Sequence, residues 1–236
     1  MLRLSASLRN SDARPGPRQC QPAHCVDLRP GRFIGFAILV LTLSVEEPAI
    51  AIESPHYSVN LQDGPFEVRD YPPLVAAITT VEGTRSHAVN SGFRLLADYI
   101  FGNNQQKSQI AMTAPVIQRQ NGTQSTPMAG NSVSWTVSFL MPAGYTLQSL
   151  PAPTNRRVRF EPIPARRVAA MQFSGFWSDS NLESHETQLV HWMQEQHLTR
   201  SSAPAYAYYD PPWKPWFLRR IEVLIEVNPR EIPARQ

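Results

Sequence analysis

The chain has 236 residues, of which 42% are hydrophobic and only 17% are charged, and this composition excludes an intrinsically disordered protein. The formal net charge of +3 comes largely from the first 51 residues, because residues 52–236 hold 16 basic and 15 acidic side chains. No basic stripe remains to neutralise phosphates, so nucleic acid is not expected as a partner.

The first element is an apolar run over residues 33–45, followed by Pro48-Ala49-Ile50-Ala51. These thirteen residues are too few to cross a bilayer, which needs about 20, but they suit the hydrophobic region of a signal peptide. The small residues Ala49 and Ala51 fit the cleavage rule. We therefore expect residues 1–51 to be a leader, cleaved after Ala51, and the rest to be exported, in a bacterium to the periplasm.

Two features of this leader depart from an ordinary signal peptide. Glu46 and Glu47 lie close to the cleavage site, and the basic segment before residue 33 is long. A translation start near Val26 or Leu28 would leave an ordinary basic region. The alternatives are a buried strand, a short uncleaved membrane anchor, or transit to an organelle lumen, because the leader is rich in Arg and poor in acids.

Both cysteines, Cys20 and Cys25, precede the expected cleavage site. The mature chain would then contain no thiol, which excludes a disulfide, a thiolate metal site and a cysteine nucleophile within it. An exported domain without disulfides must rely on its hydrophobic core.

Residues 55–150 show the pattern of two strands, a helix and two more strands. Residues 66–71 alternate apolar and polar side chains, and residues 74–81 are rich in β-branched residues. Residues 86–101 repeat apolar side chains every three or four positions, as an amphipathic helix does, and Gly102 suits the turn that ends it.

The next stretch, Ile110-Ala111-Met112-Thr113-Ala114-Pro115-Val116, has the small and apolar residues of a buried strand, and its proline, which has no N–H, is expected to end that strand. A polar loop is expected over residues 118–131. Residues 133–140 then alternate cleanly between apolar and polar, which predicts a strand.

Residues 151–228 repeat this order of elements. The expected strands lie at 158–161, 167–173, from Ala205 and at 221–227, and the helix opens at the capping box Ser180-Asn181-Leu182-Glu183. Val75-Ala76-Ala77 and Val168-Ala169-Ala170 occupy equivalent places 93 residues apart. We therefore predict an α+β fold built from a duplicated strand-strand-helix-strand-strand unit.

Five motifs stand in a specific order in this region: Glu67-Val68-Arg69-Asp70-Tyr71, Phe93-Arg94-Leu95-Leu96-Ala97-Asp98-Tyr99-Ile100-Phe101-Gly102-Asn103-Asn104, Ile110-Ala111-Met112-Thr113-Ala114-Pro115-Val116, Tyr209-Asp210-Pro211-Pro212-Trp213 and Arg219-Arg220-Ile221-Glu222-Val223. Together they resemble the SOUL haem-binding protein family over about residues 55–228. The resemblance implies a twisted antiparallel β-barrel-like sheet flanked by two α-helices. It also implies non-covalent binding of haem or related tetrapyrroles, for transport, buffering or scavenging.

The resemblance places the ligand pocket along the first helix, at positions matched by Phe93, Leu96, Ala97 and Ile100. The same residues form the apolar face with which this helix can pack on the sheet, so both uses stay open. Met112 can contact the ligand or its iron, although Met more often fills gaps in a core. Because a guanidinium pairs with carboxylates, the haem propionates are expected to contact Arg94.

No metal ligand is expected. In some SOUL-like proteins a His between the Arg and the Tyr of the first strand motif ligates haem iron, and Asp70 holds that position here. A carboxylate is a poor substitute for imidazole on haem iron, so we expect binding with weak or no His ligation. The remaining histidines show no paired metal-binding spacing; they are His56, His87, His185, His191 and His197.

Two other classes of function stay open. An enzyme would need acid or base groups, which are present but not paired into a catalytic constellation; they are Glu67, Asp70, Glu161, Glu183 and Tyr209. A carrier of another hydrophobic small molecule is the second alternative, because the expected fold also resembles bacterial effector-binding domains, which hold drug-sized ligands between repeats.

Overall fold

The computed structural model describes residues 52–122 and 133–228. The leader, with its apolar run at residues 33–45 and its cleavage site, lies outside the described residues, as does most of the expected polar loop. No helix in the described ranges is both long enough and apolar enough to span a membrane.

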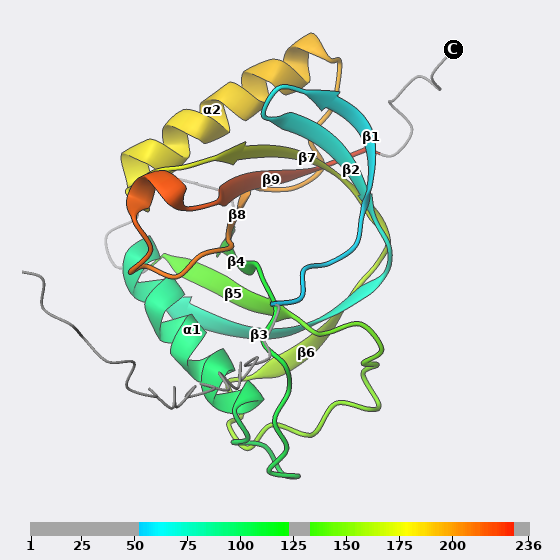
Figure 1. Cartoon of the computed structure of the whole chain (residues 1–236), viewed down its shortest axis with the longest axis vertical. Coiled ribbons are helices and arrows are strands. Elements are labelled where there is room, and N and C mark those ends of the chain that lie inside the picture. The colour runs from blue at the N-terminus through cyan, green and yellow to red at the C-terminus, as the bar shows by residue number, and fades with distance from the viewer. Residues whose placement is uncertain (1–51, 123–132, 229–236) are drawn as a thin grey trace, which may run out of the picture. The chain divides into compact units, whose positions relative to one another are not determined.

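The described residues form nine strands, two α-helices and one short 3₁₀-helix (Figure 1). In chain order they are β1 (Ser58–Asp63), β2 (Phe66–Tyr71), β3 (Leu74–Glu82), α1 (Arg85–Ile100), β4 (Val116–Asn121), β5 (Ser134–Leu140), β6 (Arg159–Ile163), β7 (Arg166–Phe173), α2 (Asp179–Glu195), β8 (Ala205–Tyr208), η1 (Trp216–Leu218) and β9 (Ile221–Val227). The predicted α+β class is confirmed.

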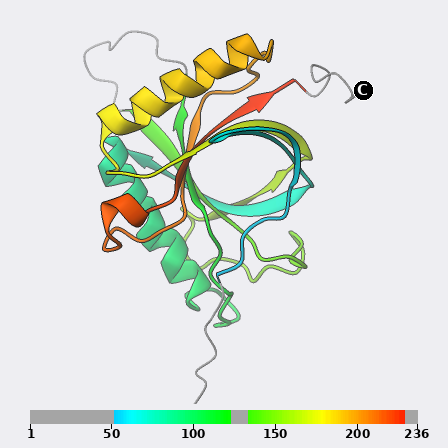
Figure 2. The ribbon, with the colours of Figure 1, turned by 45° about the horizontal axis from the view of Figure 1, so that its top comes forward.

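The strands form a single antiparallel sheet in the order β1-β2-β7-β9-β8-β4-β5-β3-β6. The sheet is open, with β1 and β6 as its edges. Figures 1 and 2 show that it curves and that α1 and α2 both lie on its outer side. Every strand in this sheet except the two edge strands therefore has a paired strand on both sides.

The two faces of the sheet have different neighbours. On the outer face, α1 packs through Leu96 and Ile100, and α2 through Leu182 and Leu189, and all four side chains are buried. On the inner face a third apolar cluster contains no helical residue and includes Ala76, Ile117, Val168 and Leu224. The strands thus carry apolar residues on both faces, which is why their alternation is incomplete.

Helix α1 is fixed at its ends by the residues that flank it. The Thr84 side chain accepts a hydrogen bond from a backbone N–H of the first turn, and Gly102, at a φ of +110°, provides the turn after the last residue. Within the helix, a Cβ added to Gly92 would lie 2.6 Å from the Val137 side chain on β5. The helix therefore lies unusually close to the sheet at this point.

The prediction of a strand at residues 110–116 is wrong. Residues 110–115 run as a loop, held by a hydrogen bond from the Thr113 hydroxyl to the Leu140 carbonyl, and β4 begins only at Val116. Pro115 precedes the strand instead of ending it, because a proline before the first strand residue removes no N–H from the ladder.

Two further bounds differ from the predictions. Residues 118–121, expected in a loop, belong to β4, since the buried Gln118 amide is satisfied by donating to the Arg85 carbonyl at 2.7 Å. Helix α2 begins at Asp179 with Ser178 as its N-cap, because the Ser178 hydroxyl accepts from the Asn181 N–H at 3.3 Å.

Candidate functional site

Three of the six predicted ligand-binding residues lie in the core. Leu96 is 0% exposed, and Ala97 and Ile100 are also buried, packed with Val137 and Phe139 of β5. These side chains use the apolar face of α1 to hold the helix on the sheet. This packing does not test whether the three residues bind a ligand, so that role stays a prediction.

The other three predicted residues keep some exposed surface. Phe93 is half-buried, with its ring edge against Phe139 at 5.5 Å between centroids, and Met112 is half-buried in the same cluster. Arg94 is exposed, with its guanidinium 3.5 Å from the Ser91 hydroxyl. A ligand at this helix would therefore meet Phe93, Arg94 and Met112 before it met the rest.

A second group of apolar residues lies beside α1, on the connection between β8 and β9, and Phe176 joins it from the segment between β7 and α2. Figures 1 and 2 both show this connection, with η1 in it, running next to α1. Trp213 is 82% exposed and Phe217 58% exposed, and Phe176 stacks on Trp216 with their centroids 5.3 Å apart. We call this group the aromatic surface; it comprises Phe176, Trp213, Trp216, Phe217 and Leu218. A group of large, solvent-exposed apolar side chains is typical of a surface that binds a ligand, another protein or a membrane.

The connection that carries the aromatic surface is held by polar contacts. Lys214 pairs with Asp210 at 2.7 Å, and the Asp210 carboxylate also accepts the Arg220 N–H at 2.6 Å. Burial raises the pKa of Asp210, but these donors outweigh it and hold that pKa below its ordinary value. Arg219 donates to the Lys214 carbonyl at 2.7 Å. The aromatic side chains are thus presented on a fixed loop.

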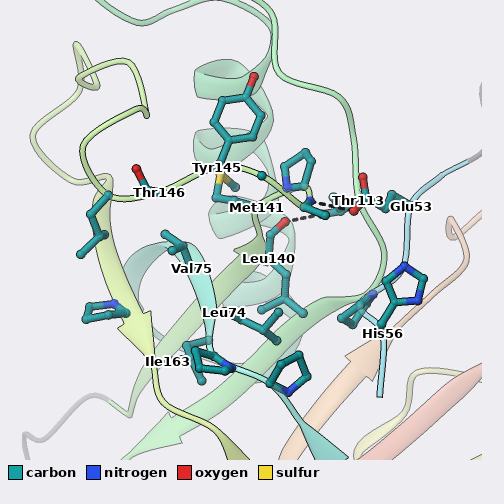
Figure 3. Close-up of a pocket in the computed structure, with 18 of the residues that line it drawn as sticks. Glu53, His56, Leu74, Val75, Thr113, Leu140, Met141, Tyr145, Thr146 and Ile163 are labelled. Carbon is teal, nitrogen blue, oxygen red and sulfur yellow. Dashed lines mark hydrogen bonds between the residues drawn. The ribbon is translucent and has the colours of Figure 1, made fainter. Parts of the chain in front are cut away.

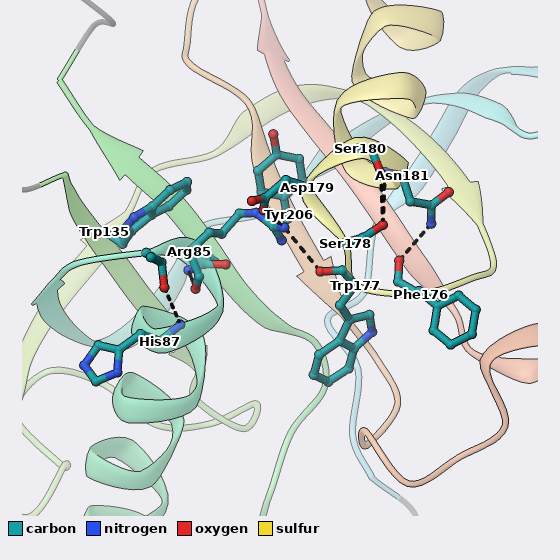
Figure 4. A network of polar contacts seen from close by, with 12 residues as sticks. Arg85, His87, Trp135, Phe176, Trp177, Ser178, Asp179, Ser180, Asn181 and Tyr206 are labelled. Atoms are coloured by element: carbon teal, nitrogen blue, oxygen red, sulfur yellow. Dashed lines mark hydrogen bonds and ion pairs between the residues drawn. The ribbon is translucent and has the colours of Figure 1, made fainter. Parts of the chain in front are cut away.

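The N-terminal ends of both helices meet in a polar network around Arg85 (Figure 4). The buried Arg85 guanidinium donates to the Tyr208 hydroxyl and to the Trp177 carbonyl, each at 3.2 Å, and pairs with the Asp179 carboxylate. Burial lowers the pKa of Arg85, yet Tyr208 and Asp179 raise it above its ordinary value. Arg85 therefore ties α1, α2 and β8 together as a structural residue.

An apolar groove lies between the loops at one end of the sheet (Figure 3). Its volume is about 630 Å³, within the range of small-molecule sites. Its walls include Leu74, Val75, Leu140, Met141 and Ile163. Two polar residues stand at its margin: the Glu53 carboxylate accepts the Ala143 N–H at 2.7 Å, and His56 is exposed. No sequence pattern points to this groove, because its walls come from segments far apart in the chain.

Two of the groups considered as metal ligands, Asp70 and His185, are engaged in other contacts. The Asp70 carboxylate accepts two hydrogen bonds from Arg167, at 2.7 and 2.8 Å, and they lower its pKa. His185 stacks on Phe173, with centroids 3.8 Å apart. Within residues 52–122 and 133–228, no three His, Cys, Asp or Glu side chains come together to hold a metal ion.

Exposed aromatic side chains and an apolar groove on an antiparallel α+β domain are suited to binding a small apolar molecule. The family described as SOUL heme-binding protein matches residues 52–226, so the chain belongs to the SOUL family. Heme-binding protein 1 of Xenopus laevis is 28% identical over 161 residues, which is 67% of this chain and 81% of that protein. Heme-binding protein 2 of Homo sapiens is 29% identical over 147 residues, 60% of this chain and 68% of that protein.

Among solved structures, the crystal structure of the EcmrR C-terminal domain is similar in fold. It superposes with a TM-score of 0.52 at 12% identity, over 73% of this chain and 98% of that domain. At this identity the likeness concerns the fold alone.

Proposed function

We propose that this chain binds haem or a related tetrapyrrole without a covalent bond, and that it does so beside α1. Membership of the SOUL family and two relatives named heme-binding proteins support the choice of ligand. The observation that carries the site is the aromatic surface, which is exposed and lies next to the helix that holds Phe93 and Arg94.

The residues at this surface fit the chemistry of the ligand. Haem is a flat apolar ring with two carboxylates on one edge. Trp213, Trp216 and Phe93 offer aromatic area, and each Å² of apolar area removed from water contributes about 25 cal/mol. The propionates need a cation, and the exposed guanidinium of Arg94 can form a forked pair with a carboxylate. When bound, haem supplies its iron and its absorption, and the protein supplies orientation and shelter from water.

A titration tests the proposal. Wild-type protein should give a saturable Soret shift with haem. Phe93→Asp places a charge against the ring and should weaken binding at least tenfold, and Arg94→Gln should weaken it by severalfold. Arg157→Gln removes an exposed charge from a loop outside the proposed site and is the matched control for Arg94→Gln. Equal affinity in the wild type and in a folded Phe93→Asp variant would exclude this site.

The groove of about 630 Å³ favours a second candidate, the carriage of a different hydrophobic molecule. Ile163→Lys places a charge in the groove wall. If this variant loses haem while Phe93→Asp keeps it, the groove is the haem site. If wild-type protein shows no Soret shift at all, the carrier of another molecule becomes the better description.

We also propose that the domain is exported for transport, buffering or scavenging of its ligand. The support is the apolar run at residues 33–45 followed by Ala49-Ile50-Ala51. Mass spectrometry of protein from the native host should give an N-terminus at Ile52. A mature protein that still contains residues 33–45 would exclude a cleaved signal peptide.

The order of elements supports a further proposal, an internal duplication with a barrel-like sheet. Strands β2 to β5 surround α1 in the same chain order as β6 to β9 surround α2. In this comparison β2, β3, β4 and β5 are equivalent to β6, β7, β8 and β9. When each strand from β2 to β6 in the sheet order is replaced by its equivalent, the result is the same order read backwards. The test is to produce residues 52–150 and 151–236 as two separate chains and to mix them. Reassembly of the two chains would agree with two such units, and chains that cannot associate would count against them.

A further inference from the structure

The inner face of the sheet, which the helices do not cover, carries a cleft of about 410 Å³. Its apolar wall includes Ile78, Ile117 and Ile163. Arg119 of β4 and Arg166 of β7 line the same cleft. The cleft thus combines a hydrophobic wall with two guanidinium groups, on the side of the sheet away from α1 and the aromatic surface.

The two arginines converge on one carboxylate oxygen. Glu226 Oε1 lies 2.6 Å from Arg166 Nη1 and 3.3 Å from Arg119 Nη2. The two cations therefore share this one anion, and the other carboxylate that lines the cleft is that of Glu161. In the part of the chain that the structure describes, the Nε–H groups of Arg119 and Arg166 are buried without a hydrogen-bond partner. Buried donors of this kind are rare, and an acceptor that reached them would remove an energetic penalty.

The other polar groups of the cleft do not supply that acceptor. The Thr136 hydroxyl donates to Asn121 Oδ1 at 2.7 Å, and the Ser138 hydroxyl donates to the Ile117 carbonyl at 3.4 Å. Glu161 also lines the cleft, but its side chain is exposed, so water screens its charge. A ligand carboxylate is the group that matches two partly buried guanidinium forks.

We propose that this cleft binds the carboxylate of an amphipathic molecule, such as a medium-chain fatty acid. The carboxylate accepts from the donors of Arg119 and Arg166 that Glu226 does not occupy, and the apolar body contacts Ile78, Ile117 and Ile163. The apolar groove shares its Pro162–Ile163–Pro164 wall with the cleft, and a longer tail continues along it. This site is separate from the haem surface proposed above and does not depend on it.

Calorimetric titration with decanoate tests the site. Arg119→Gln/Arg166→Gln should weaken binding at least tenfold, while Arg156→Gln/Arg157→Gln, which removes two exposed charges before β6, should stay within twofold of the wild type. Decan-1-ol should bind at least tenfold more weakly than decanoate. Decanoate binding unchanged in the double variant, or decan-1-ol binding as tightly as decanoate, would overturn the proposal.

Three further measurements sharpen this result. Arg166→Lys keeps the positive charge but removes the forked guanidinium, so it should weaken decanoate binding at least threefold. If the double variant does not fold, this single variant tests the proposal in its place. Affinity should rise from hexanoate to decanoate by up to about fourfold per buried methylene, and a flat series would exclude the tail in the groove. Haem should not compete with decanoate; displacement of one by the other would show a single shared site.

Discussion

The Arg69 guanidinium on β2 donates two hydrogen bonds to the Glu222 carboxylate on β9, at 2.7 and 3.0 Å, although the two residues are 153 positions apart. Their side chains are 1% and 0% exposed. Burial acts against both charges, yet each group's pKa moves toward the charged form: that of Glu222 is held below its ordinary value by Arg69 and Arg220, and that of Arg69 is raised by Glu222. Because β7 lies between β2 and β9, the pair crosses one strand of the sheet.

Removing one partner of this pair should be more harmful than removing both. Arg69→Met leaves Glu222 buried with Arg220 as its remaining cation, and we expect a loss of about 3–5 kcal/mol of unfolding free energy. Arg69→Met/Glu222→Leu should lose less, because the fully buried carboxylate is removed together with Arg69, and Arg220, which loses its partner, is 36% exposed to water. Urea denaturation measures both. A double variant that is less stable than Arg69→Met would contradict the argument.

Stability should fall at acid pH. The pKa values of Glu222, Asp70 and Asp210 are lower in the folded protein than the ordinary values of 4.5 for Glu and 3.8 for Asp. A carboxyl with a depressed folded pKa binds protons more readily in the unfolded chain, so its contribution is present above the ordinary value and is lost as pH falls through the folded value. Urea midpoints should be level near neutrality and decrease below about pH 4.5.

Glu222→Gln should flatten this acid dependence, because it removes the most buried of the three carboxyl groups. Glu195→Gln, an exposed change on α2, should keep the wild-type slope. An identical slope in the wild type and in Glu222→Gln would show that Glu222 does not dominate the acid response.

Leu96→Ala should lower the unfolding free energy by about 2–5 kcal/mol, since Leu96 is fully buried between α1 and the sheet. Arg94→Ala, two positions earlier and exposed, should stay within about 0.5 kcal/mol of the wild type. Thermal or urea unfolding compares the two. A loss below about 0.5 kcal/mol for Leu96→Ala would overturn the assigned face of the helix.

Gly92→Ala should destabilise the protein, although alanine favours isolated helices by about 1 kcal/mol over glycine. The new Cβ would meet Val137 at 2.6 Å, so α1 would have to move away from β5. Asn90→Ala on the exposed side of the same helix should be neutral or slightly stabilising. Gly92→Ala should cost less in a Val137→Ala background than in the wild type; an equal cost in both backgrounds would show that Val137 is not the obstacle.

Local patterns predict most of this fold. Clean alternation in residues 133–140 marks β5, and apolar spacing in residues 86–101 marks α1. No such pattern marks β1, an edge strand with mostly exposed side chains. The extent of β4 into residues 118–121 also escapes prediction, because the buried Gln118 amide finds its partner at Arg85, 33 residues away. A polar residue becomes acceptable inside a sheet only through contacts that the fold creates.

The candidate sites are harder to predict, because they depend on distant segments. Periodicity assigns Leu96 and Ile100 to one face of α1 but cannot show whether sheet or ligand covers that face. The density of Trp and Phe between Pro211 and Leu218 is a usable sequence signal for the aromatic surface, but their exposure follows only from the structure. Arg119 and Arg166 are brought to one cleft by the sheet order.

The last prediction concerns how haem is held. The family's position for an iron-ligating His holds Asp70, whose carboxylate is occupied by two hydrogen bonds from Arg167. Binding should therefore rest on ring contact with Phe93 and the aromatic surface and on the charge of Arg94. Iron-free porphyrin should then bind within about tenfold of haem, a difference of about 1.4 kcal/mol. Spectral titrations of both ligands measure this.

Single His→Ala variants at positions 56, 87, 185, 191 and 197 complete the test of this binding mode. If no imidazole ligates the iron, each variant should leave the haem spectrum nearly unchanged, because the binding energy then comes from burial of the ring. His56→Ala is the most informative of them, since His56 stands exposed at the apolar groove. Loss of the Soret band in any one of these folded variants, together with weak porphyrin binding by the wild type, would show that an iron ligand dominates and that ring contact does not.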